Sequence, residues 1–197
     1  MAAFFSSLNR TIIAGIVIVL VMVGVAGTYQ LFGQMGYWQF FMRWLHILSG
    51  VMWIGLLWYF NFVQTPSMPK IPDEQKPAIG KVIAPTALFW FRWGAMSTLI
   101  TGALLAWMNG YLLQALSLQK PFTPIGVGAW LAIIMWFNVW FIIWPNQQKA
   151  LNIDNRYPDL PADQKAAAAK AAGQFSRVNT LLSIPMLFCM VAATHWP

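Results

Sequence analysis

The chain has 197 residues, of which 59% are hydrophobic and only 9% are charged, and its formal net charge is +7. Soluble domains carry about 25% charged residues, so this composition excludes an ordinary soluble protein and indicates a single membrane domain over residues 1–197. The positive charge does not indicate nucleic-acid binding, because most basic residues flank apolar segments, where they set topology and contact anionic lipid.

Five apolar segments are long enough to cross a bilayer, which takes about 20 apolar residues. In chain order they cover residues 11–31, 37–62, 84–108, 124–144 and 178–196. Helix-forming signals after Asp159 lead directly into the last segment. The sequence therefore predicts an all-α integral membrane protein, folded as a bundle of five transmembrane helices.

The distribution of basic residues predicts the orientation of these helices. The loops at 63–83 and 145–177 hold most of the lysines and arginines, and Arg10 precedes the first segment. The opposite loops contain only Lys120. Because basic loops stay in the cytoplasm, we expect a cytoplasmic N-terminus and a periplasmic C-terminus, with the chain in the bacterial inner membrane.

The second segment carries a candidate cofactor site. Arg43, His46 and Gly50 follow one another at spacings of three and four residues, which places them on one side of a helix. His46 would lie about 9–13 Å from the outer end of the segment. This arrangement suits a haem b: the imidazole ligates the iron, the glycine admits the macrocycle, and the arginine pairs with a propionate.

The charge balance supports the same site. A buried cation normally needs an anion close by. All five acidic residues lie in the two polar stretches, away from the apolar segments. The propionates of a haem would supply the missing negative charge, as would lipid phosphate or a partner subunit.

His195, the second histidine, lies near the outer end of the last segment. Both histidines then belong to the outer half of the membrane, and His195 is a candidate second axial ligand. Ligation by His46 alone stays open. The alternative for His46 is a neutral imidazole that forms a hydrogen bond between helices without any cofactor.

Arg92 is a candidate anion-binding residue. It lies about two turns inside the cytoplasmic end of the third segment. Its long side chain can extend to lipid phosphate or to an acid in the cytoplasmic loops, and the alternative is a bound substrate or quinone anion. No grouping of residues marks a catalytic centre.

Four segments resemble the membrane N-terminal domain of the bacterial integral-membrane urate oxidase family. They are RWLHILSGVMWIGLLWYFNFVQ (43–64), ALFWFRWGAMSTLITG (87–102), MWFNVWFIIWPNQQ (135–148) and RVNTLLSIPMLFCMVAATH (177–195). In that family the membrane domain is fused to a cytochrome c domain that takes the electrons, so the resemblance implies a redox membrane protein. The present sequence has no C-x-x-C-H haem-attachment motif, because Cys189 is its only cysteine.

These observations lead to three functional hypotheses. The first is a membrane-embedded electron-transfer protein that binds haem b and works with a respiratory partner, such as a cytochrome or an oxidase subunit. The second is a cofactor-free accessory subunit of a larger respiratory or oxidase complex. The third is the oxidation of urate or another small anion.

Overall fold

A computed structural model describes residues 5–195, except for the side chains of Thr194 and His195. The described residues form helices and connecting turns and contain no strand. Their contacts divide the chain into two compact units, residues 1–41 and 42–197, which are described separately.

The first unit contains helix α2 (Leu8–Val25), the 3-10 turn η1 (Thr28–Leu31) and the beginning of α3 (Met35–Trp58). Gly27 follows the end of α2 and has a positive φ of 67°, which reverses the chain. Glycine adopts this conformation readily because it has no Cβ to clash with the backbone. The indole of Trp38 donates a hydrogen bond to the main-chain oxygen of Phe32, at 2.9 Å, and so holds the start of α3 against the turn.

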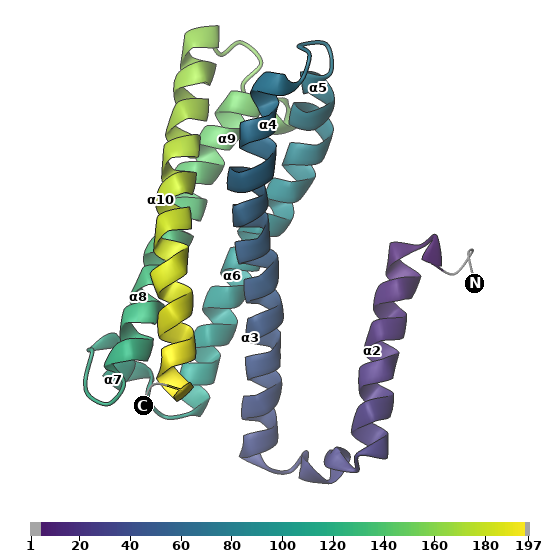
Figure 1. The fold of residues 1–197 in the computed structure, drawn as a ribbon, viewed down its shortest axis with the longest axis vertical. Helices are drawn as coiled ribbons and strands as arrows, with labels where there is room; N and C mark the ends of the chain where they lie inside the picture. The colour runs from purple at the N-terminus through teal and green to yellow at the C-terminus, as the bar shows by residue number, and fades with distance from the viewer. Residues whose placement is uncertain (1–4, 196–197) are drawn as a thin grey trace. The chain divides into compact units, whose positions relative to one another are not determined.

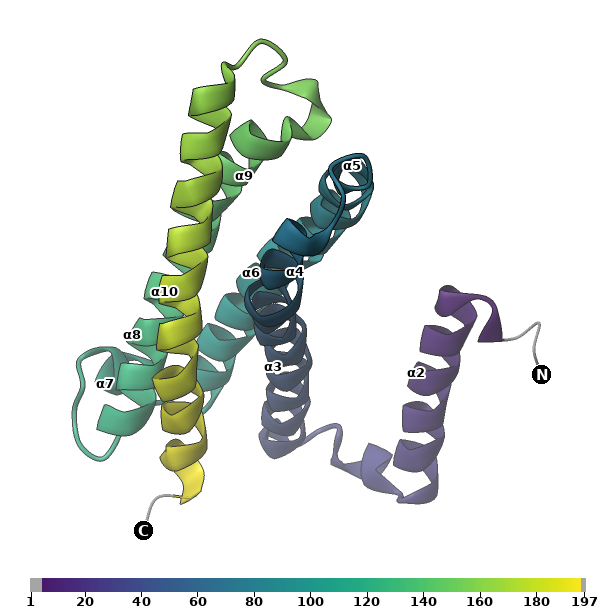
Figure 2. The same cartoon turned by 45° about the horizontal axis from the view of Figure 1, so that its top comes forward.

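The second unit is an antiparallel arrangement of long helices (Figures 1 and 2). It comprises α3, α6 (Ala84–Met108), α8 (Thr123–Phe137), α9 (Trp144–Leu151) and α10 (Ala162–His195). The shorter elements are η2 (Tyr59–Gln64), α4 (Thr65–Ser67), η3 (Met68–Lys70), α5 (Lys76–Ala78), η4 (Ile79–Ile83), α7 (Leu112–Leu116), η5 (Asn138–Ile143) and η6 (Ile153–Asn155). Helix α10 packs along α8 and α9 over most of its length.

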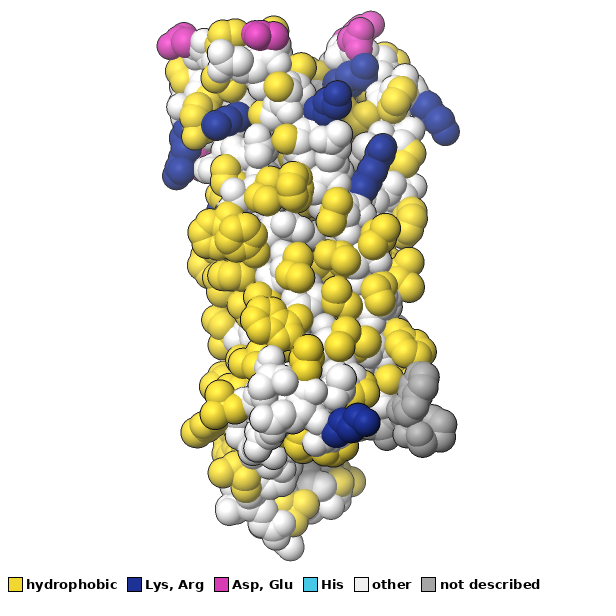
Figure 3. All heavy atoms as spheres, turned by 90° about the vertical axis from the view of Figure 1, so that its left-hand side faces the viewer, with side chains coloured by type: hydrophobic (Ala, Val, Ile, Leu, Met, Phe, Trp, Pro, Cys, Tyr) yellow, Lys and Arg dark blue, Asp and Glu magenta, His cyan; other side chains and the backbone are white. Residues whose placement is uncertain are grey.

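The core of this unit is built from large apolar side chains that are fully buried between the helices. Trp53 and Leu57 come from α3, Phe91 from α6, and Met135 and Ile143 from the α8 to α9 segment. Much of the outer surface is also apolar (Figure 3). Helices that are apolar on all sides suit a membrane, where lipid covers the outward face.

Among the described residues, four helices are long and apolar enough to cross a membrane: 8–25, 35–70, 123–151 and 162–193. They overlap the first, second, fourth and fifth predicted segments, with different ends. Helix α6 has the bounds predicted for the third segment, 84–108, but is not among these four. The all-helical membrane fold is therefore confirmed, while the fifth crossing and the orientation stay predictions.

The predicted loops at 63–83 and 145–177 are largely helical. Three π-helical segments, η2, η4 and η5, continue the long helices, and each ends two residues before a proline: Pro66, Pro85 and Pro145. Proline lacks an N–H and its ring clashes with the carbonyl four residues earlier. The wider π turn relieves that clash, so these helices continue through proline instead of ending.

Candidate functional site

The imidazole of His46 lies between α3 and α6. Its Nδ1 is 3.0 Å from the main-chain oxygen of Thr98 and 3.2 Å from Oγ1 of Thr101. A carbonyl oxygen can only accept a hydrogen bond, so Nδ1 carries the hydrogen. In a neutral ring this leaves Nε2 unprotonated, with a lone pair that can bind a metal.

Gly102 allows the imidazole to approach α6 this closely. A Cβ at position 102 would lie 2.8 Å from Cε1 and 3.2 Å from Nδ1 of His46. At Gly94, two turns earlier, a Cβ would lie 3.3 Å from the main-chain nitrogen of Trp53. With Thr98 between them, small residues recur at every fourth position, the spacing at which membrane helices approach closely. The sequence analysis missed Gly102, although this spacing was a signal for it.

Gly50 and Arg43 lie one turn on either side of His46 along α3. A Cβ at Gly50 would meet nothing within 4 Å, so this position has open space beside it. Arg43 is exposed. Burial raises the pKa of Tyr111, in the turn after α6, and the positive charge of Arg43 offsets part of that rise. The three predicted site residues therefore share one stretch of α3, with Tyr111 within the electrostatic reach of Arg43.

His195 is the last residue of α10, and its side chain lies outside the described residues. Its predicted role as a second axial ligand stays a prediction. The described part of the chain contains no group of three or more His, Cys, Asp or Glu side chains that could hold a metal ion. Haem iron needs only one or two axial side chains from the protein. The predicted haem site is therefore not a cluster of three or more ligands, and the absence of such a cluster does not test it.

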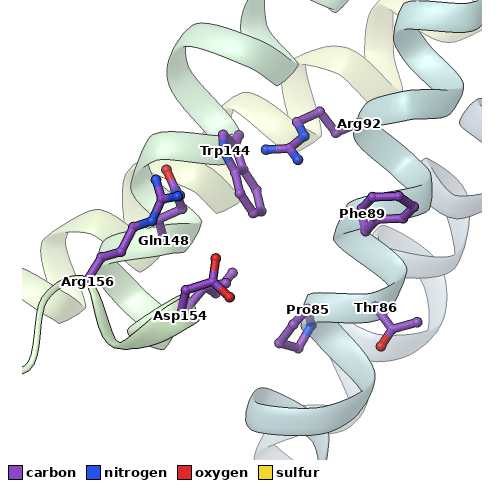
Figure 4. A pocket seen from close by; sticks show the side chains of 9 residues that line it. Pro85, Thr86, Phe89, Arg92, Trp144, Gln148, Asp154 and Arg156 are labelled. Atoms are coloured by element: carbon purple, nitrogen blue, oxygen red, sulfur yellow. The ribbon is translucent and has the colours of Figure 1, made fainter.

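A second candidate site surrounds Arg92, near the opposite end of α6. A cavity of about 430 Å³ lies there between α6, α9 and the loop that follows α9 (Figure 4). Its lining consists of Pro85, Thr86, Phe89, Arg92, Trp144, Gln148, Ile153, Asp154 and Arg156. We call this the Arg92 cavity.

The guanidinium of Arg92 points across the cavity to the ring of Trp144 (Figure 4). Its central carbon is 3.9 Å from the centre of that ring and 5.0 Å from the centre of Trp140. A cation over an aromatic face is stabilised by the ring quadrupole. The aromatic rings therefore hold the guanidinium at the cavity wall.

The sequence analysis identified Arg92 but not its neighbours. Asp154 faces the cavity from the loop after α9 but forms no ion pair with Arg92. Gln148 and Arg156 also line the cavity. These three residues lie more than 50 positions after Arg92, on other elements. A local sequence pattern therefore could not predict that they surround it.

Residues 122–197, from the end of the loop before α8 to the C-terminus, match the family model described as urate oxidase N-terminal. This stretch contains the two later segments of the predicted resemblance, 135–148 and 177–195, and the match confirms the resemblance over that stretch. The segments 43–64 and 87–102, with His46 and Arg92, lie outside the match. No curated protein and no solved structure gave a match.

Proposed function

We propose that this chain is a membrane-embedded redox protein that binds haem b through His46. The observation that carries the proposal is the hydrogen bond from Nδ1 of His46 to the main-chain oxygen of Thr98. Histidines that ligate metals commonly donate their other ring N–H to a carbonyl or carboxylate, which fixes the ring and makes the ligating nitrogen more basic. His46 has this arrangement inside an apolar helix.

The neighbouring residues fit the same role. Gly50 leaves open space one turn from His46, where a flat macrocycle needs room. Arg43 carries a positive charge one turn in the other direction and would pair with a propionate. Haem b would supply one-electron transfer. The proposal of His195 as a second ligand rests on the sequence alone.

The likeness of residues 122–197 to a urate oxidase N-terminal domain supports the proposal that the chain takes part in a redox process. We propose that the haem exchanges electrons with another protein. The proposed partner is a cytochrome or an oxidase subunit at the same membrane.

The proposed location is the bacterial inner membrane, with the N-terminus in the cytoplasm and the C-terminus in the periplasm. The basic segments 65–83 and 149–165 lie at one end of the second unit (Figure 1). On the face shown in Figure 3 the acidic side chains and most basic ones gather at that end, and apolar side chains dominate beyond it. Basic residues at one end support its placement in the cytoplasm.

One observation favours a second candidate, the cofactor-free accessory subunit. The imidazole of His46 is already held by Thr98 and Thr101 and packs on Gly102. These contacts would give His46 a structural role without any haem, since polar side chains tie membrane helices together. In the first candidate Nε2 of His46 also binds the haem iron, and in the second His46 contacts only α6.

The variant His46→Gln separates the candidates. A glutamine amide N–H can donate to the Thr98 oxygen, but an amide is not an axial haem ligand. His46→Ala removes both functions. Each protein would be purified from cells that make haem, and its reduced-minus-oxidised visible spectrum and thermal stability would be measured.

Under the haem proposal the wild type shows a b-type spectrum and both variants lose it. His46→Gln should still be more stable than His46→Ala, because it keeps the hydrogen bond to the Thr98 oxygen. Imidazole added to His46→Gly should restore part of the haem signal, because it can fill the vacated ligand position. A colourless wild-type protein in which only His46→Ala is destabilised would reject the haem proposal and support the accessory subunit.

A further inference from the structure

The Arg92 cavity has an unbalanced positive charge. Arg92 and Arg156 both line it, and Asp154 is its single acidic residue among the described residues. Two arginines and one aspartate leave a net charge of +1, which one monovalent anion would neutralise.

Two side chains of the cavity lining also carry buried hydrogen-bond donors without acceptors. Nε of Arg92 and Nε2 of Gln148 are buried and have no partner. Buried donors are nearly always paired, because an unpaired one costs about 1–3 kcal/mol. Both groups are donors, so the missing partner is an acceptor, and an anionic oxygen satisfies the donors and the charge together.

The surroundings of the cavity are aromatic and apolar. Phe89 lines it and is exposed, and its ring contacts Trp93, at 6.4 Å between ring centres. Trp93 in turn contacts Trp140, at 5.4 Å. The cavity lies near the end of α6 that adjoins the polar loops. Because Phe89 and Trp93 lie beside it, a charged group bound at Arg92 would have an apolar protein surface next to it.

We propose that the Arg92 cavity binds a phosphate monoanion, and that its source is the phosphodiester headgroup of an anionic membrane lipid. The two arginines and Gln148 would bind the phosphate oxygens, and the acyl chains would lie against Phe89 and Trp93. The volume of about 430 Å³ is within the usual range for a small ligand. This site is separate from the proposed haem site, because Arg92 and Gly102 are about 15 Å apart along α6.

Native mass spectrometry of the purified protein with added phosphatidylglycerol or phosphatidylcholine tests this proposal. Arg92→Gln and Arg156→Gln each remove one cavity charge, and Lys170→Gln removes a matched exposed charge on α10 outside the cavity. Each cavity variant should weaken phosphatidylglycerol binding about tenfold, the equivalent of one charge-assisted hydrogen bond. The control should bind like the wild type. Arg156 is exposed in a loop, so its variant keeps the test valid if Arg92→Gln fails to fold.

A thermal-shift series with inorganic phosphate distinguishes the two sources of phosphate. Stabilisation by inorganic phosphate that both cavity variants abolish, without retained lipid, would support the site and assign it to free phosphate. Equal loss of lipid binding in all three variants would show general charge attraction and overturn the proposal. Stabilisation by urate, and not by either phosphate source, would also overturn it.

Discussion

His46 has contacts that a lone histidine in an apolar helix needs. Its Nδ1–H reaches the main chain of α6, and its ring lies against Gly102, where there is no side chain. The position of the ring is therefore determined by α6 as much as by α3. The interaction of His46 with α6 can be tested without changing His46 itself.

Gly102→Ala should displace the imidazole, because the new Cβ would lie 2.8 Å from Cε1 of His46. Overpacking of this kind costs about 1–3 kcal/mol of unfolding free energy, and under the haem proposal the haem content falls with it. Thermal unfolding and the visible spectrum measure the two effects. Gly55→Ala on α3 is the matched control, since its Cβ would meet nothing within 4 Å. Equal unfolding free energies for the two variants would contradict the close contact between Gly102 and the His46 ring.

Tyr111 should make the stability of the protein depend on pH in the alkaline range. Burial raises its pKa above the ordinary value of 10.0, with a smaller opposing effect from Arg43. The folded state therefore holds the phenol proton more tightly than the unfolded state, and this contribution to stability is present below about pH 10 and lost as the pH rises through the folded pKa.

Tyr111→Phe should make the fall in melting temperature above about pH 10 shallower. The variant keeps the ring that stacks on Phe122, 5.1 Å away between centres, so a packing change should not obscure the result. Melting curves at a series of alkaline pH values provide the measurement. An unchanged slope would show that Tyr111 does not titrate differently in the two states.

Ionisable residues in apolar segments could be found from the sequence, and their partners could not. Arg43, His46 and Arg92 stood out because charge inside a membrane segment is rare. Gln148 carries no such signal, and the signal for Gly102 was its spacing from Gly94 and Thr98. Their roles follow from which residues of other helices they face.

At the level of the helices, a polar network joins the η5 segment to α10. The amide of Asn138 donates to Oδ1 of Asn179 at 2.8 Å, and the amide of Asn179 donates to the main-chain oxygen of Met135 at 2.9 Å. Both asparagines are buried. The sequence analysis left this pairing unspecified, because residues on separate helices share no sequence period.

Asn179→Leu should destabilise the protein by about 1–3 kcal/mol, because it leaves the buried Asn138 amide without an acceptor. Thr180→Val is the control, since the Thr180 hydroxyl bonds only to Ser176 of its own helix. Denaturant titration in detergent gives both free energies. Equal losses in the two variants would show that the network contributes little between helices.

Apolar length predicted where the helices lie, but it did not predict where all of them end. The third segment was predicted at 84–108 and α6 has those bounds. The second and fourth segments continue through π turns and prolines into stretches predicted as loops. A proline usually indicates a helix end, and the π turns that accommodate it here are not visible as a pattern of apolar residues.

For the whole molecule, the central structural prediction is orientation. In a Cys189→Ala background, single cysteines at Glu74→Cys and Lys120→Cys would report the two ends of the second unit, as both native side chains are exposed. A membrane-impermeant thiol reagent added to cells with a permeable outer membrane should label position 120 and spare position 74 until the inner membrane is broken. The reverse pattern would invert the proposed topology.

The account as a whole depends on whether His46 holds a haem. The most direct measurement is the haem content of the purified wild-type chain by pyridine haemochrome assay, beside His46→Gln prepared in the same way. We predict about one b-type haem per chain in the wild type and almost none in the variant. A wild-type protein without haem from haem-replete cells, or a variant with wild-type haem content, would contradict the account.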